Sequence, residues 1–191
     1  MLLIDLTLPV TDGMAAYPGD PPVRIRPIHN LAAQGWRLSE VSLGSHTGTH
    51  VNAPWHMAGE GARLEELELG CFVGRAAVRR PCDGDIPQGV GLIYADAPLD
   101  ENELPLVLAA RPPFVAQAVE FPLDEAVERE LCRAGLVSFE NLANTAMLPR
   151  GEVFLFMGLP LPLSGDGAPA RAVAMLDFPA TSPEHAGTGQ G

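Results

Sequence analysis

The stretch from His46 to His56, HTGTHVNAPWH, places three of the chain's five histidines within eleven residues. Ligands of one metal lie about 2.0–2.2 Å from it, so the tips of their side chains must converge. On an extended strand His46 and His50 would lie ~13 Å apart. Gly48 permits a sharp turn between them, and Pro54 fixes the chain before His56. The spacing therefore predicts a turn that brings the imidazoles together, for metal binding, for acid/base chemistry or as a hydrogen-bonded loop.

Composition describes one globular domain with an acidic surface. The chain has 191 residues, of which 47% are apolar and 19% charged, which is typical of a globular rather than a disordered protein. The formal net charge is −12, and every cationic side chain is an arginine. The charge argues against nucleic acid as a partner, and the lack of lysine excludes Schiff-base chemistry and a P-loop. The expected partner is a small molecule.

The cysteines predict a reduced environment. Cys71, Cys82 and Cys132 are odd in number, lie far apart and form no CxxC pair, so a disulfide framework is not expected. No apolar run reaches the ~18 residues of a membrane span, and the N-terminus lacks a secretory signal. We therefore expect a cytoplasmic protein without a membrane segment. Histidine and carboxylate are the natural ligands left, which favours zinc, with manganese as the alternative.

Frequent glycine and proline, 20 and 19 residues, predict short strands and turns. The convincing helix is 123–134, where acids fill the first turn and Gly135 follows the last, and a second is predicted at 63–69. We expect a layered α/β domain over residues 1–178 and a loose tail over 179–191, where His185 has no expected role. The predicted strands are 2–7, 23–28, 38–43, 73–78, 90–95, 113–119, 136–139, 153–159 and 171–176.

The histidine motif resembles the HxGTHxDxPxH signature of the cyclase family, which contains bacterial kynurenine formamidases and isatin hydrolases. Three flanking segments also resemble that family in the expected order: DLTLPVTDGMAAYPGDPP, GLVSFENLAN and LPLPLSGDGAPARAVAML. The resemblance covers roughly residues 4–177. It implies a swivelling β/β/α three-layer domain with mostly short strands and two or three helices.

The resemblance also implies an activity. It suggests metal-dependent hydrolysis of a small cyclic or aryl amide or lactone, as when an arylformamidase converts N-formylkynurenine to kynurenine and formate. By the same resemblance His46 and His50 are metal ligands, and His56 is the general acid/base. Glu140 is a carboxylate ligand or an acid/base partner. A homodimer or higher homo-oligomer is the implied assembly.

Two positions depart from the family pattern. The aspartate of the motif, which bridges two metals in the formamidases, is here Asn52, and a histidine expected twelve residues before Glu140 is here Glu128. A neutral amide cannot supply the bridging anion, so one metal per chain is expected rather than two. Asn52, through its oxygen, and Glu128 remain candidate ligands, although Glu128 reads equally as a solvated helix acid. The alternative function is a catalytically impaired small-molecule binding or interaction domain.

Scarce aromatic residues and a turn supply further candidates. Tyr17 and Trp55 lie in the motif segments and are expected to line a pocket for an aryl group. Asp166 and Arg171, in the turn-rich segment SGDGAPAR, are expected to form an ion pair. Arg171 could instead bind a substrate carboxylate.

Overall fold

The computed structural model describes residues 1–177, so the tail predicted from residue 179, with His185, lies outside the described residues. The strands are β1 Leu2–Asp5, β2 Arg24–His29, β3 Leu38–Ser42, β4 His50–Asn52, β5 Val73–Val78, β6 Gly91–Tyr94, β7 Val115–Ala118, β8 Ser138–Leu142, β9 Val153–Pro160 and β10 Gly167–Leu176. The α-helices are α1 Leu31–Gln34, α2 Leu104–Ala110 and α3 Glu125–Arg133. Short 3₁₀ turns cover Pro54–His56, Leu64–Glu66, Leu69–Cys71 and Thr145–Met147.

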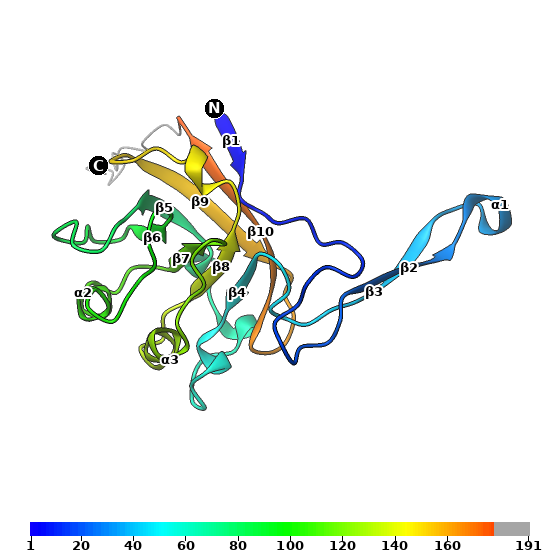
Figure 1. The fold of residues 1–191 in the computed structure, drawn as a ribbon, viewed down its shortest axis with the longest axis horizontal. Coiled ribbons are helices and arrows are strands. Elements are labelled where there is room, and N and C mark those ends of the chain that lie inside the picture. Colours follow the sequence, from blue (N-terminus) through cyan, green and yellow to red (C-terminus); the bar gives the residue numbers. More distant parts are fainter. Residues whose placement is uncertain (178–191) are drawn as a thin grey trace, which may run out of the picture.

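One strongly bent sheet forms the body of the molecule (Figure 1). Its strand order is β1-β10-β4-β8-β7-β6-β5-β9, and β9 also pairs with β10, so the sheet closes on itself like a barrel. Inside it, Phe114, Phe139 and Phe156 contact one another with ring centroids 4.8–5.8 Å apart. Gly91 leaves the space that the Phe114 ring fills, since a Cβ there would lie 2.2 Å from that ring.

Helices α2 and α3 cover the outer side of β6 and β7 with a second apolar cluster. Val107 of α2 and Val127 and Leu131 of α3 are buried there with Leu92 and Val115 of the sheet. Two facing walls of one bent sheet and a helix layer outside them match the β/β/α layering implied by the resemblance. The predicted fold class is therefore confirmed.

The predicted elements agree with the structure except in four places. Each of the nine predicted strands overlaps an observed strand, and the predicted helix is α3, capped by Asp124, which accepts from two backbone N–H groups. The helix predicted at 63–69 is wrong, because only the 3₁₀ turn Leu64–Glu66 forms there. Strand β4 and helices α1 and α2 were not predicted. Three residues are too few for β4 to show an alternating pattern.

Strands β2 and β3 form a separate hairpin that projects from the body with α1 at its tip (Figure 1). We call residues 24–42 the arm. Every residue of β3 is exposed, and α1 buries none of its side chains. Trp36 and Val41 are each 56% exposed. An isolated two-stranded hairpin is marginally stable in water, and residues 1–177 supply no packing partner for this arm. Within residues 1–177, the helices are too short or too polar to cross a membrane.

Candidate metal centre

The short strand β4 carries the centre of the histidine motif. His50 and Asn52 alternate with Val51, so both side chains lie on one face of the sheet while Val51 is fully buried in the core. The antiparallel register sets His50 opposite Glu140 and Asn52 opposite Ser138 on β8. Four polar side chains from two neighbouring strands therefore meet on the same face.

A turn that is held by side-chain hydrogen bonds leads into β4. Gly48 adopts φ +64°, in the left-handed region that favours glycine. The Thr49 hydroxyl donates to the Asn141 carbonyl at 2.6 Å, and the Asn141 side chain donates to the Gly48 carbonyl at 3.0 Å. This turn brings the His46 and His50 rings to a centroid separation of 5.1 Å. The sequence spacing predicted this convergence.

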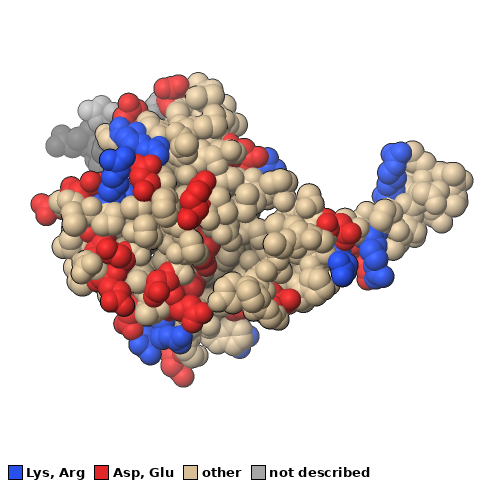
Figure 2. All heavy atoms as spheres, viewed as in Figure 1, with Lys and Arg blue, Asp and Glu red and all other residues tan. Residues whose placement is uncertain are grey.

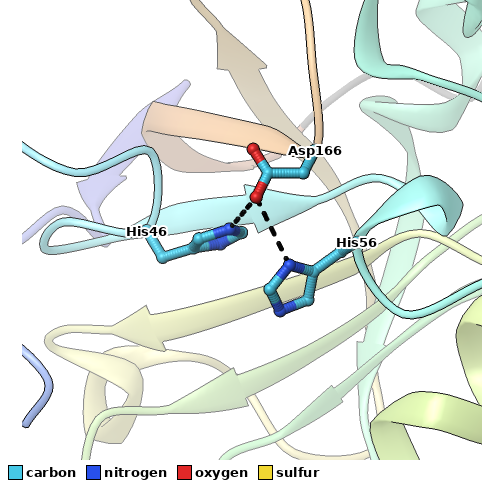
Figure 3. A group of neighbouring side chains, drawn as sticks. All are labelled: His46, His56 and Asp166. Carbon is cyan, nitrogen blue, oxygen red and sulfur yellow. Dashed lines mark hydrogen bonds and ion pairs between the residues drawn. The ribbon is translucent and has the colours of Figure 1, made fainter. Parts of the chain in front are cut away.

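His56 and Asp166 complete a cluster around His46 (Figure 3). His56 follows Pro54 in a 3₁₀ turn, and its ring centroid lies 4.1 Å from that of His46. The Asp166 Oδ2 atom lies 2.8 Å from His46 Nε2 and 3.5 Å from His56 Nδ1. One ligand atom from each residue lies within 4.8 Å of the others. Two imidazoles and one carboxylate are a ligand set of catalytic zinc sites, which keep a further position open.

Asp166 was missed as a site residue, and its predicted ion pair with Arg171 is wrong. Arg171 pairs instead with Asp5, with Nη2–Oδ2 and Nε–Oδ1 distances of 2.7 and 3.0 Å. That pair lines a separate groove of about 580 Å³ that contains none of the motif histidines. The expectation failed because β10 begins at Gly167 rather than near residue 171, which sets Asp166 beside β4. A hint lay in the SGDG sequence, where an acid is held between glycines.

The glycine after Asp166 has a steric reason. A Cβ at Gly167 would lie 2.4 Å from the Val51 carbonyl oxygen and 3.0 Å from His46 Cε1. Contacts under 3.0 Å force something to shift, and the backbone of β4 is not free to do so. The missing side chain therefore lets His46 lie against the start of β10, where it reaches Asp166.

Asn52 is 1% exposed and uses both ends of its amide. Its Oδ1 atom lies 2.8 Å from His46 Nδ1. Its Nδ2 atom donates to Glu140 Oε1 at 2.9 Å and to Glu128 Oε1, with Ser138 Oγ at 3.3 Å. The amide thus links the outer histidine to two carboxylates deeper in the protein.

Glu128 is 5% exposed, so it is not the solvated helix acid that the sequence also allowed. It lies on α3, which packs against the 3₁₀ turn Pro54–His56, and turns inward toward β4. His50 donates from Nδ1 to the Gly48 carbonyl at 2.9 Å, and its Nε2 lies 3.5 Å from Glu140 Oε1. The structure therefore groups His50, Asn52, Glu128 and Glu140, and sets His46 at the border with the outer cluster.

The two inner carboxylates differ in pKa. Burial, reinforced by the neighbouring Glu140 charge, raises the pKa of Glu128 to about 7. Burial also acts to raise the pKa of Glu140, but the hydrogen bond and charge of His50 outweigh it, and the net pKa lies below the ordinary value. Glu140 is accordingly the ionised member at neutral pH, while Glu128 can hold a proton.

The outer cluster suits a cation. Burial, followed by repulsion from His46, lowers the pKa of His56, so its ring is neutral at pH 7. Burial acts to raise the pKa of Asp166, but the hydrogen bond and charge of His46 dominate and hold it below its usual value. A neutral imidazole and an ionised carboxylate are the protonation states that metal binding requires.

The predicted substrate-binding aromatics lie at the surface. Tyr17 is 68% exposed, and its hydroxyl donates to Glu125 Oε1 at 3.2 Å, which ties its loop to the start of α3. Trp55 is 36% exposed, with the Arg63 guanidinium carbon 4.1 Å from its ring centroid. Among residues 1–177, nothing encloses either ring.

Comparisons with known proteins identify relatives of this chain. Residues 4–85 match the family model described as "Putative cyclase". A kynurenine formamidase of Salinibacter ruber (strain DSM 13855 / M31) is 30% identical, over 91% of this chain and 97% of the relative. One of Geobacillus thermodenitrificans (strain NG80-2) is 27% identical, over 88% and 95%.

Solved structures share the fold. Isatin hydrolase A from Labrenzia aggregata superposes with a TM-score of 0.76 at 19% identity, over 91% of this chain and 93% of that one. A predicted metal-dependent hydrolase from Bacillus stearothermophilus gives a TM-score of 0.71 at 24% identity, over 91% and 97%. With a relative at 30% identity over nearly the whole of both chains, this chain belongs to the cyclase family, the family of the bacterial kynurenine formamidases.

Proposed function

We propose that the chain is a metal-dependent amide hydrolase of arylformamidase type, which converts N-formylkynurenine to kynurenine and formate. The observation that carries the proposal is the cluster of His46, His56 and Asp166, whose ligand atoms lie within 4.8 Å of one another beside an ionised buried carboxylate. The names of the kynurenine formamidase relatives, similar over most of their length, support the substrate class.

Zinc is the proposed cation, with manganese as the alternative, because the donors are imidazole and carboxylate. His46 Nε2, His56 Nδ1 and Asp166 Oδ2 would hold it. A bound divalent ion supplies Lewis-acid polarisation of a carbonyl and acidifies water in such sites. For His56 we propose this ligand role in place of the acid/base role that the motif resemblance implied, since its ring centroid lies 4.1 Å from that of His46 and its Nδ1 faces the same Asp166 oxygen.

Proton transfer is proposed for Glu140. It is the inner carboxylate whose pKa is held below its ordinary value by His50, so it can accept a proton at neutral pH. The Leu123 backbone N–H, at 3.4 Å from Oε2, and Asn52 orient it. His50 donates from Nδ1 to the Gly48 carbonyl. We propose that it also stabilises the ionised form of Glu140, and it remains a candidate metal ligand by the motif.

Tyr17 and Trp55 are proposed to contact the aryl part of the substrate. Trp55 immediately precedes His56, and the Tyr17 hydroxyl donates to Glu125 in the first turn of α3, the helix that carries Glu128. Large exposed aromatic surfaces are suited to stacking on an aryl ring.

A homodimer or larger homo-oligomer is the proposed assembly. The arm carries three of the chain's 12 arginines and one of its 24 acidic residues, so it is cationic while the remainder is strongly acidic. Figure 2 shows this contrast: blue atoms stand out on the arm, and red atoms crowd the body. An apolar, cationic hairpin that the described part of the chain leaves uncovered fits the acidic body of a second copy. The cytoplasmic location expected from the sequence stays a prediction.

The test is turnover of N-formylkynurenine by protein loaded with zinc or manganese, followed through kynurenine and formate together. We expect activity that a chelator removes and that the same metal restores. Binding of the substrate without turnover by fully loaded protein would favour the alternative, a catalytically impaired binding domain.

A further inference from the structure

We infer that the Asn52 side chain takes the place of a second cation between Glu128 and Glu140, so that the site holds one metal ion, at His46, His56 and Asp166. This inference rests on the metal binding of the proposed function. It concerns which residues bind the ion and which do not, and it removes Asn52 and Glu128 from the candidate ligands.

The first argument is the count of donors and acceptors on Asn52. A primary amide offers one oxygen and two N–H groups. The oxygen faces His46 Nδ1 at 2.8 Å, and the N–H groups face the Glu128 and Glu140 oxygens. The opposite assignment of oxygen and nitrogen would set an acceptor against two carboxylates. Asn52 is therefore a donor toward both glutamates, and its Nδ2 atom lies between the two side chains, where a second cation would have to bind.

The second argument is the tautomer of His46. The nitrogen that binds a metal is set by the hydrogen bond that the other nitrogen makes. With its Nδ1–H donated to Asn52 Oδ1, His46 leaves Nε2 for a metal; without a metal, Nε2–H donates to Asp166 Oδ2 at 2.8 Å. Asn52 is thus a positioning residue for His46, and the metal position that it favours lies on the Asp166 side.

The third argument is depth. The side chains of His46, His56 and Asp166 are 19%, 24% and 37% exposed. Asn52 and Glu128, as residues, are 1% and 5% exposed. An ion can therefore reach the outer cluster directly. A second ion would have to displace a buried amide that already has four polar partners.

The experiment measures bound metal per chain by elemental analysis after equilibration with excess zinc or manganese and removal of the unbound ion. We expect about one ion in the wild-type chain, about one in Glu128→Gln and almost none in Asp166→Asn. Glu130→Gln, an exposed acid on the same helix, is the matched control and should resemble the wild type. Two ions in the wild type, reduced to one by Glu128→Gln, would overturn the inference.

Substitutions of Asn52 test its positioning role. Asn52→Ala should weaken metal affinity by about 10–100-fold, which is the range for removing a residue that hydrogen-bonds a metal ligand. Asn52→Asp keeps an acceptor for His46 and should retain the first ion. It also leaves three carboxylates without the amide donor, so we expect a second ion to bind and a melting temperature that falls in chelator and rises with metal. Unchanged affinity in Asn52→Ala, or unchanged stoichiometry in Asn52→Asp, would contradict the inference.

These outcomes are separable from failure of the proposed function. A chain that binds one ion as expected but hydrolyses no formamide would leave the role of Asn52 intact and refute the proposed activity. Wild-type protein that binds no ion would refute both.

Discussion

His46 and Asp166 are 120 residues apart in the chain, yet His46 Nε2 lies 2.8 Å from Asp166 Oδ2. Sheet pairing produces this contact. Strand β10 runs antiparallel to β4 with Gly167 opposite Asn52, and the Ala53 N–H donates to the Asp166 carbonyl at 2.9 Å. This pairing fixes Asp166 directly before the start of β10, next to the turn before β4 that carries His46.

Removing the charge of Asp166 should remove the metal. Asp166→Asn keeps the size of the side chain but loses the only carboxylate of the outer cluster. We therefore expect metal affinity to fall more than about 100-fold, which exceeds the usual effect of losing a residue that only hydrogen-bonds a metal ligand. Titration calorimetry with zinc and with manganese measures it. Asp85→Asn, at an exposed loop aspartate, is the control. Retained affinity in Asp166→Asn would exclude the aspartate as a ligand.

His56→Ala distinguishes the two roles considered for this histidine. As a ligand, its loss should lower bound metal and activity together. If the ring only moves protons, metal content stays at the wild-type level while kcat falls by about 10²–10⁴. We expect the first result, because His56 and His46 face the same Asp166 oxygen. Elemental analysis and kcat, measured on the same preparation, decide between them.

The local part of the site was predictable from sequence, and the long-range part was not. The turn at Gly48 and the restriction at Pro54 are properties of single residues, so the convergence of the three histidines followed from their spacing. Asp166 enters through the pairing of β10 with β4, which no local pattern encodes. Its predicted partner Arg171 illustrates the limit: nearness in sequence suggested an ion pair that the strand geometry replaces with Asp5.

The same division holds for the fold. Alternation and turn residues predicted nine strands, and a capped amphipathic stripe predicted α3. The inward turn of Glu128 could not be predicted, because it depends on which side of α3 faces β4. The projecting arm is also a tertiary feature, because whether a hairpin joins the main sheet or stands apart depends on long-range strand pairing.

The raised pKa of Glu128 makes a prediction for the pH dependence of stability. Its folded pKa of about 7 lies above the ordinary 4.5, so the folded state retains a proton that the unfolded state releases. Stability is complete below about pH 4.5 and is lost as the pH rises toward 7. In chelator, the melting temperature of Glu128→Gln should match that of the wild type near pH 5 and exceed it at pH 8, by on the order of 5 °C. Parallel curves for the two proteins would show that Glu128 is ionised throughout.

The arm predicts self-association that depends on both apolar contact and charge. Trp36 is 56% exposed on a hairpin that contributes no buried side chain in α1 or β3, while the rest of the chain carries nearly all of the acidic residues. We expect light scattering during size-exclusion chromatography to give at least twice the 20.2 kDa chain mass for the wild type. Trp36→Glu should shift the protein toward the monomer, because it removes apolar area and places a negative charge against an acidic partner. Leu106→Glu, at a 50% exposed leucine of α2, is the control for a new surface charge and should leave the mass unchanged.

Raising the salt concentration should weaken the assembly of the wild type, since exposed charge pairs are screened beyond ~10 Å at 0.1 M ionic strength. A wild-type monomer at micromolar concentration, or an oligomer equally stable in Trp36→Glu, would assign the exposed arm to something other than a second copy of this chain.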